Sequence, residues 1–139
     1  MNVYTGGTFD LFHAGHVRLL RRCRELAGAS GEVVVALNDD DFVEDFKGKR
    51  PVVPYEGRAE VLRACRFVDR VIRNEGGPDS RPAIEAASPD LIVVGSDWLE
   101  RDYLAQLGPS AEWLTERGIG LCFLPYTKGV SSTLIREAI

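Results

Sequence analysis

The feature that most constrains the fold of this chain is an alternation of short apolar runs with amphipathic segments. Residues 32–37 (EVVVAL) and 90–95 (DLIVVG) are nearly continuous apolar runs bounded by turn residues, which is typical of strands covered on both faces. Residues 13–26 instead repeat apolar side chains at helical spacing among arginines. Strands and helices that alternate in this way indicate βαβ units with right-handed crossovers, and hence a parallel sheet.

The same pattern gives the expected elements along the chain. We expect strands at 2–6, 32–37, 68–72, 90–95 and 120–124. We expect helices at 13–26, 55–66, 78–87, 98–117 (broken near Gly108-Pro109) and 131–138, with one further turn near 40–46 in the otherwise irregular stretch 38–54. Val61, Leu62 and Cys65 are expected to point inward, and Ser80 to cap its helix. The predicted fold class is α/β: a single Rossmann-like domain over residues 1–139, with a doubly wound, five-stranded parallel sheet and helices on both faces.

Length, charge and cysteine content narrow the class of protein. A chain of 139 residues suits one domain. It has no apolar run of about 18 residues that could span a membrane, and its N-terminus lacks the features of a signal peptide. The net charge of -4 disfavours a role in coating nucleic acid. Cys23, Cys65 and Cys122 are odd in number and widely spaced, so we expect reduced packing thiols in a cytoplasmic protein.

The two histidines of the chain, His13 and His16, stand one helical turn apart after the glycine pair Gly6-Gly7. Glycines let the backbone approach a bulky anion, and the helix that follows offers free N–H groups and the positive end of its dipole. Two imidazoles on that turn suit a phosphate in transfer, because they can donate hydrogen bonds to oxygens that gain charge. The alternatives are a simple helix-capping turn, or half of a zinc site that lacks a third ligand nearby.

Three candidate motifs fall at the ends of predicted strands, at residues 6–16, 95–98 and 126–133. Ligands of such sheets bind beyond the carboxyl ends of the strands, near the topological switch point, so these motifs should meet on one rim. Two of only three lysines, Lys47 and Lys49, lie in a charged loop. That loop is either a solvated surface segment or a lid that closes over a triphosphate.

The segments Gly7-Thr8-Phe9-Asp10 and His13-Ala14-Gly15-His16 resemble the GTFD and HxGH signature of the nucleotidyltransferase superfamily. The wider chain resembles the cytidylyltransferases, particularly the glycerol-3-phosphate enzymes, through residues 46–48, 58–71, 95–98 and 128–133. The resemblance implies transfer of CMP from CTP to a small phosphate- or phosphonate-bearing acceptor, with release of pyrophosphate. It also implies Mg²⁺ bound through the triphosphate and a homodimer, with neither nucleic acid nor membrane as a partner.

The resemblance assigns roles to individual residues. Catalysis falls to His13, His16 and Lys47. Nucleotide binding falls to Gly7, Thr8, Phe9, Asp10, Gly15, Asp97, Thr127, Ser131, Ser132 and Thr133. Acceptor binding falls to Lys49, Arg58, Arg66 and Trp98. The plainer alternatives are a surface salt bridge for Arg58, a structural role for Arg66, a turn for Asp97, a core position for Trp98 and a helix cap for residues 131–133.

The chain also departs from the family pattern. Tyr126 stands where cytidylyltransferases carry arginine, so a guanidinium that would clamp phosphate is missing, and Lys128 could replace part of its charge. Ser96 stands where the glycerol-3-phosphate enzymes have a second aspartate.

Because residues 131–136 also resemble the tail motif of pantetheine-phosphate enzymes, an adenylyltransferase that uses ATP is the alternative activity. A nucleotide-binding module without turnover is the alternative outside enzymes. Glycerol 3-phosphate is the default acceptor; choline phosphate, ethanolamine phosphate, another polyol phosphate and a small phosphonate stay open.

Overall fold

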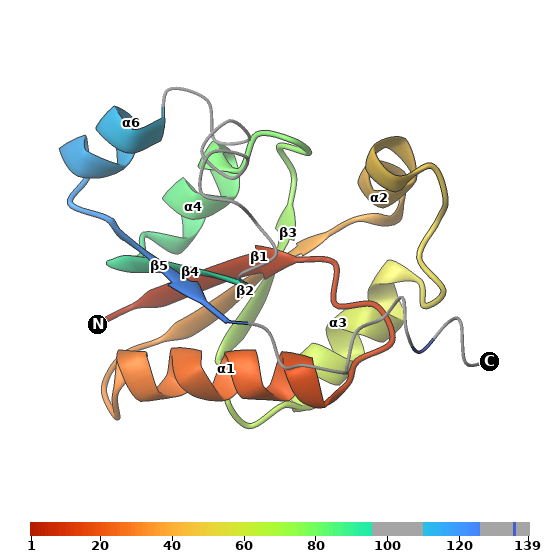
Figure 1. Cartoon of the computed structure of the whole chain (residues 1–139), viewed down its shortest axis with the longest axis horizontal. Helices are drawn as coiled ribbons and strands as arrows, with labels where there is room; N and C mark the ends of the chain where they lie inside the picture. Colours follow the sequence, from red (N-terminus) through yellow and green to blue (C-terminus); the bar gives the residue numbers. More distant parts are fainter. Residues whose placement is uncertain (96–109, 126–134, 136–139) are drawn as a thin grey trace.

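The computed structural model describes residues 1–95, 110–125 and 135. Five parallel strands form one sheet in the order β3-β2-β1-β4-β5 (Figure 1). Their bounds are β1 Val3–Gly7, β2 Val33–Asn38, β3 Arg70–Asn74, β4 Leu91–Gly95 and β5 Gly120–Leu124. The predicted five-stranded parallel sheet is therefore confirmed, with each strand within two residues of its expected position.

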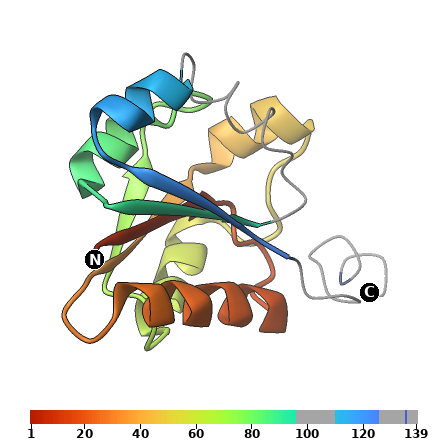
Figure 2. The same cartoon turned by 60° about the vertical axis from the view of Figure 1, so that its left-hand side comes forward.

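Helices cover both faces of the sheet, as predicted. Helices α1 (Ala14–Ala27) and α3 (Tyr55–Ala64) lie on one face, and α4 (Arg81–Ala87) and α6 (Ser110–Glu116) on the other (Figure 2). Helix α2 (Asp40–Lys47) stands beyond the end of β2, where the expectation was a single turn. Helix α2 is capped at both ends, which accounts for its second turn. The Asp39 side chain accepts a hydrogen bond from the Phe42 N–H, and Gly48 takes the left-handed conformation at the C-cap.

The inner strand β2 shows why residues 33–37 are a continuous apolar run. Val34 and Ala36 pack with residues of α4 and α6 on one face, whereas Val35 and Leu37 pack with α3 and α1 on the other. Successive side chains of a strand point to opposite faces, so a strand buried on both faces needs apolar residues at every position.

One expectation about a helical face is wrong, and one about a helix cap is met only in part. Val61 is 43% exposed, whereas Arg58, Ala59 and Leu62 are buried. Positions 58, 59 and 62 therefore form the inward face of α3. Because one of them is an arginine, this face does not appear in the sequence as a set of apolar residues at helical spacing. Ser80 takes the N-cap position of α4, but its side chain makes no capping hydrogen bond.

The remaining expectations concern cysteines and segments with little description. All three cysteines are free thiols; Cys23 is fully buried and the other two are partly buried. Burial raises the pKa of Cys23 to about 12, so this thiol stays protonated at neutral pH. Helix α6 begins directly after Gly108-Pro109, while the expected helix over 98–109 lies outside the described residues, as does that over 131–138 apart from Ile135, which is helical. Within the described ranges, no helix has the length and apolarity to cross a bilayer.

Candidate active site

The switch point of this sheet lies between β1 and β4, which are neighbours although they are far apart in sequence. The chain leaves β1 toward α1 on one face, and helix α6, which lies between β4 and β5 in sequence, covers the other face (Figures 1 and 2). Connections that diverge in this way open a crevice outside the carboxyl ends of the two strands, the usual ligand site of such folds. The loop that carries the histidines starts at this crevice.

His13 and His16 cap helix α1 through a reciprocal pair of hydrogen bonds. The Gly15 N–H donates to Nδ1 of His13 at 3.0 Å, and the His13 N–H donates to Nδ1 of His16 at 3.1 Å. This is the geometry of a capping box, built with imidazoles in place of a hydroxyl and a carboxylate. The capping turn considered as an alternative is thus present, but it uses only one nitrogen of each ring.

The capping bonds fix the tautomer of both rings. A neutral imidazole that accepts a hydrogen bond at Nδ1 carries its proton on Nε2. Burial is the main cause that lowers the pKa of His16 to about 4; the charge of His13 lowers it further and that of Asp10 opposes the shift. Burial also lowers the pKa of His13. Near neutral pH both rings are therefore uncharged and offer Nε2–H as a hydrogen-bond donor, with their centroids 3.9 Å apart and their planes 26° from parallel.

The loop between β1 and α1 is strained and firmly held. Phe9 and Leu11 have φ values of 52° and 49°, a left-handed conformation that costs of order 1–3 kcal/mol for each residue other than glycine. The carboxylate of Asp10 accepts hydrogen bonds from the N–H groups of Leu11, Val52 and Val53 at 2.8–3.1 Å. Asp10 therefore ties the histidine loop to the segment that follows α2.

The strain places an aromatic ring against the histidines. The Phe9 ring lies 5.2 Å from that of His16, and the Phe12 ring lies 5.3 Å from it. A Cβ at Gly7 would come within 3.1 Å of the Phe9 ring, so a side chain there would push that ring toward His16. This close approach is a physical reason for glycine at position 7.

A row of polar side chains, which the sequence reasoning missed, follows the ends of β1, β2 and β3. Asn38 donates to the Thr8 hydroxyl at 3.3 Å, and Asn74 donates to Oδ1 of Asn38 at 2.9 Å and to the Gly77 carbonyl at 3.0 Å. The Thr8 oxygen thus accepts from the protein, and its own proton can go to a ligand oxygen. The signal available in the sequence was the asparagine that ends β2 and the asparagine that ends β3.

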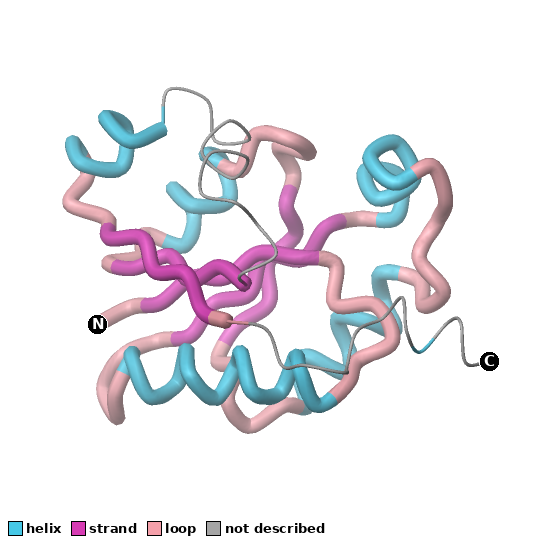
Figure 3. Tube along the Cα trace, viewed as in Figure 1, coloured by secondary structure: helices cyan, strands magenta, loops and turns pink. Residues whose placement is uncertain are grey.

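The predicted cationic residues are not all brought to this rim. Lys47 ends α2 and Lys49 follows it, both exposed, at the same end of the sheet as the histidine loop (Figure 3). Arg58 is buried, and its guanidinium is bonded within the protein. Arg66 lies between α3 and the amino-terminal end of β3, at the opposite end of the strands from this rim, and its guanidinium is 5.2 Å from the Phe67 ring. Outside the described residues lie Asp97, Trp98, Thr127, Ser131, Ser132 and Thr133.

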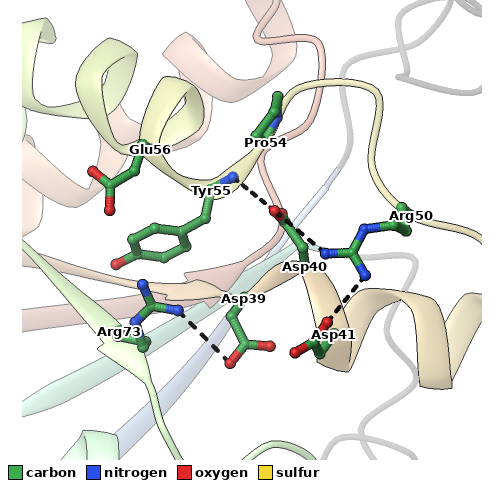
Figure 4. A pocket seen from close by; sticks show the side chains of 8 residues that line it. All are labelled: Asp39, Asp40, Asp41, Arg50, Pro54, Tyr55, Glu56 and Arg73. Carbon is green, nitrogen blue, oxygen red and sulfur yellow. Dashed lines mark hydrogen bonds and ion pairs between the residues drawn. The ribbon is translucent and has the colours of Figure 1, made fainter.

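A separate pocket of about 260 Å³ lies beside α2 and α3 (Figure 4). Its walls are Asp39, Asp40, Asp41, Arg50, Pro54, Tyr55, Glu56 and Arg73. The Arg73 guanidinium stacks 3.9 Å from the Tyr55 ring and faces Asp39 at 3.8 Å, and Arg50 pairs with Asp41 at 3.0 Å. The lining holds four carboxylates and only two guanidiniums, so it does not favour an anionic ligand, and the pocket lies beyond β2 and β3 rather than at the switch point.

Comparison with known proteins extends over nearly the whole chain. Residues 4–138 match the family model described as Cytidylyltransferase-like. The glycerol-3-phosphate cytidylyltransferase of Staphylococcus aureus is 34% identical over 99% of this chain and 93% of its own length. The FAD synthase of Pyrococcus abyssi is 41% identical over 70% of this chain, and the match spans 64% of that enzyme's length.

A solved structure shows the same architecture. The lipopolysaccharide core biosynthesis protein from Thermoplasma volcanium superposes with a TM-score of 0.70 and 25% identity, covering 94% of this chain and 98% of that one. In this chain the loop after β1 carries the paired histidines. This chain belongs to the cytidylyltransferase-like family.

Proposed function

We propose that this protein transfers CMP from CTP to a small phosphate- or phosphonate-bearing acceptor and releases pyrophosphate, with glycerol 3-phosphate as the first acceptor to test. The observation that carries the proposal is the pair of uncharged imidazoles that cap α1 at the switch point and keep both Nε2–H groups as donors. The match to a glycerol-3-phosphate cytidylyltransferase over 99% of the chain supports the choice of nucleotide and acceptor.

The chemistry needs positioning and charge neutralisation more than a base. An anionic oxygen of the acceptor attacks the α-phosphorus in line, the new P–O bond forms, and the bond to the β-phosphate oxygen breaks so that pyrophosphate leaves. That oxygen is already ionised near neutral pH, so no residue has to remove a proton. The two Nε2–H groups would donate to α-phosphate oxygens as these gain charge, and Lys47 and Lys49 would add positive charge. Mg²⁺ would enter as part of the substrate and would neutralise part of the charge of the triphosphate.

A second candidate is adenylyl transfer from ATP. The identity of 41% to the FAD synthase of Pyrococcus abyssi favours it, because joining AMP to flavin mononucleotide yields FAD. Both activities use the same in-line displacement and the same histidine pair, so the described geometry serves either.

Pyrophosphate release decides between them. The purified protein would be given CTP or ATP with Mg²⁺, each with glycerol 3-phosphate, choline phosphate, ethanolamine phosphate, a phosphonate or flavin mononucleotide. We expect turnover with CTP and one of the small acceptors. Turnover only with ATP and flavin mononucleotide would establish the second candidate, and nucleotide binding by calorimetry without turnover for any pair would reject both.

The homodimer implied by resemblance is also a proposal. Phe67 lies between two guanidiniums, that of Arg21 at 5.7 Å and that of Arg66 at 5.2 Å, on the segment that resembles the cytidylyltransferase interface. We expect light scattering at micromolar concentration to give twice the mass of 15.4 kDa. A monomeric mass under those conditions would contradict the dimer.

A further inference from the structure

Arg58 is the largest side chain that the fold buries completely among the described residues. Its side chain is only 1% exposed although it carries a full positive charge. A buried charge is tolerated only when it is paired and its hydrogen-bond donors are satisfied. The partners of this guanidinium therefore indicate what it does in the protein.

Those partners come from three separate segments of the chain. Nη1 donates to the carbonyls of Thr8 at 2.8 Å and Asn38 at 2.9 Å. Nε donates to the carbonyl of Val53 at 2.8 Å, and Nη2 pairs with Oδ1 of Asp40 at 2.6 Å. One planar group thus joins the end of β1, the end of β2, the start of α2 and the segment before α3.

Asp40 continues the connection on its other oxygen. Its Oδ2 accepts a hydrogen bond from the Tyr55 N–H at 3.2 Å (Figure 4). Pro54, at the N-cap of α3, has no side-chain capping bond, so the carboxylate from α2 satisfies an otherwise unpaired donor at the positive end of α3. Burial alone would raise the pKa of Asp40, but the hydrogen bonds from Arg58 and Tyr55 outweigh it and keep that pKa below its ordinary value. The pair is therefore ionised at neutral pH.

The segments joined by Arg58 and Asp40 are those that carry the predicted catalytic groups. Thr8 leads into the loop that ends at His13 and His16, while Val53 ends the loop that carries Lys49. Val53 is held twice, because its N–H donates to Asp10 and its carbonyl accepts from Arg58. Two buried side chains, Asp10 and Arg58, thus fix the distance between the histidine loop and the loop that carries Lys49, which we call the lysine loop.

We propose that Arg58, with Asp40, is a positioning residue for nucleotidyl transfer: it sets the histidine loop and the lysine loop around one phosphate without touching the acceptor. This inference rests on the proposed function. It differs from the role that resemblance assigns to Arg58, which is to hold the phosphoryl group of the acceptor. The two roles predict different kinetics, because loss of an acceptor contact raises the acceptor KM, whereas loss of positioning lowers kcat.

The test compares Arg58→Lys with Arg63→Lys. Lysine keeps the charge but lacks the planar fork that reaches three carbonyls and a carboxylate. For Arg58→Lys we expect kcat of pyrophosphate release to fall about 100-fold, the order expected for a displacement of about 1 Å between reacting groups, with the acceptor KM little changed. Arg63 is a matched control, since it is an exposed arginine on the same helix α3 and points away from the buried contacts of Arg58. Its variant should keep the wild-type kcat and KM.

Hydrogen exchange supplies a readout that does not depend on activity. We expect the amides of Val52 and Val53 to exchange faster in Arg58→Lys and to match the wild type in Arg63→Lys. If Arg58→Lys does not fold, Asp40→Asn should show the same lower kcat and faster exchange, and in a folded double variant the two effects should not add.

Two results would overturn the proposal: a raised acceptor KM with unchanged kcat, or wild-type kcat together with wild-type exchange at Val52 and Val53. Absence of turnover in the wild type with every nucleotide would refute the proposed function instead. In that case the exchange comparison still decides whether Arg58 holds the two loops.

Discussion

Each imidazole of the pair uses its two nitrogens for different purposes. Nδ1 of His13 and of His16 accepts a backbone N–H and so stabilises the first turn of α1. Nε2 is left as the donor that the proposed transition state needs. Stability and catalysis can therefore be separated by side chains that imitate one nitrogen at a time.

The substitution His13→Asn should keep the cap and lose the donor. Asparagine is a good N-cap residue, so we expect a free energy of unfolding close to that of the wild type. Turnover should fall about 100-fold or more, because one transition-state hydrogen bond is lost. His13→Ala should lose turnover to the same extent and also about 1 kcal/mol of stability. Urea unfolding and steady-state kinetics check both variants, and wild-type turnover in His13→Asn would refute the assigned role.

The low pKa of His16 predicts a loss of stability in acid. Below its ordinary value of 6.5 the unfolded chain takes up a proton at this site, whereas the folded protein does so only near pH 4. The contribution of His16 is thus fully present above about pH 6.5 and is lost as the pH falls to about 4, at up to about 1.4 kcal/mol per pH unit.

Glutamine at position 16 provides the comparison, because it can accept the same backbone hydrogen bond but does not titrate in this range. Urea unfolding between pH 7 and pH 4 should therefore show a steeper loss for the wild type than for His16→Gln. Parallel curves for the two proteins would show that His16 is not held neutral by the fold.

At the scale of elements, both the prediction and its failures follow from which face a residue occupies. Strand β2 was predictable because both of its faces are buried and residues 33–37 are all apolar. The face of α3 was not, because Arg58 takes an inward position and its partners are mainly backbone carbonyls. Every residue has a backbone carbonyl, so no sequence pattern predicts which carbonyls such an arginine will contact.

Adjacent substitutions in α3 test this assignment of faces. Leu62 is fully buried, so Leu62→Ala should lower the free energy of unfolding by about 2–5 kcal/mol. Val61 is 43% exposed, and Val61→Ala should change it by no more than about 0.5 kcal/mol. Chemical denaturation of both variants measures the difference, and equal losses would contradict the register of α3.

At the scale of the whole molecule, the parallel sheet places sequence-distant segments on one rim. The alternation of strands and helices was enough to predict that rim and to place the loop with the two histidines on it; the role of this loop as the active site stays a prediction. The row from Thr8 through Asn38 to Asn74 could not be foreseen as a row, because it depends on the spatial order of β1, β2 and β3 rather than on their order in the chain.

The central claim is that both imidazoles point their Nε2–H groups at the α-phosphate of a nucleoside triphosphate held at the β1/β4 switch point. A crystal structure with a non-hydrolysable CTP analogue and Mg²⁺ tests it most directly. The account predicts both Nε2 atoms at about 3 Å from α-phosphate oxygens, with the Nδ1 capping bonds intact. Rings turned away from the nucleotide, or imidazoles that coordinate a metal ion in its place, would contradict it.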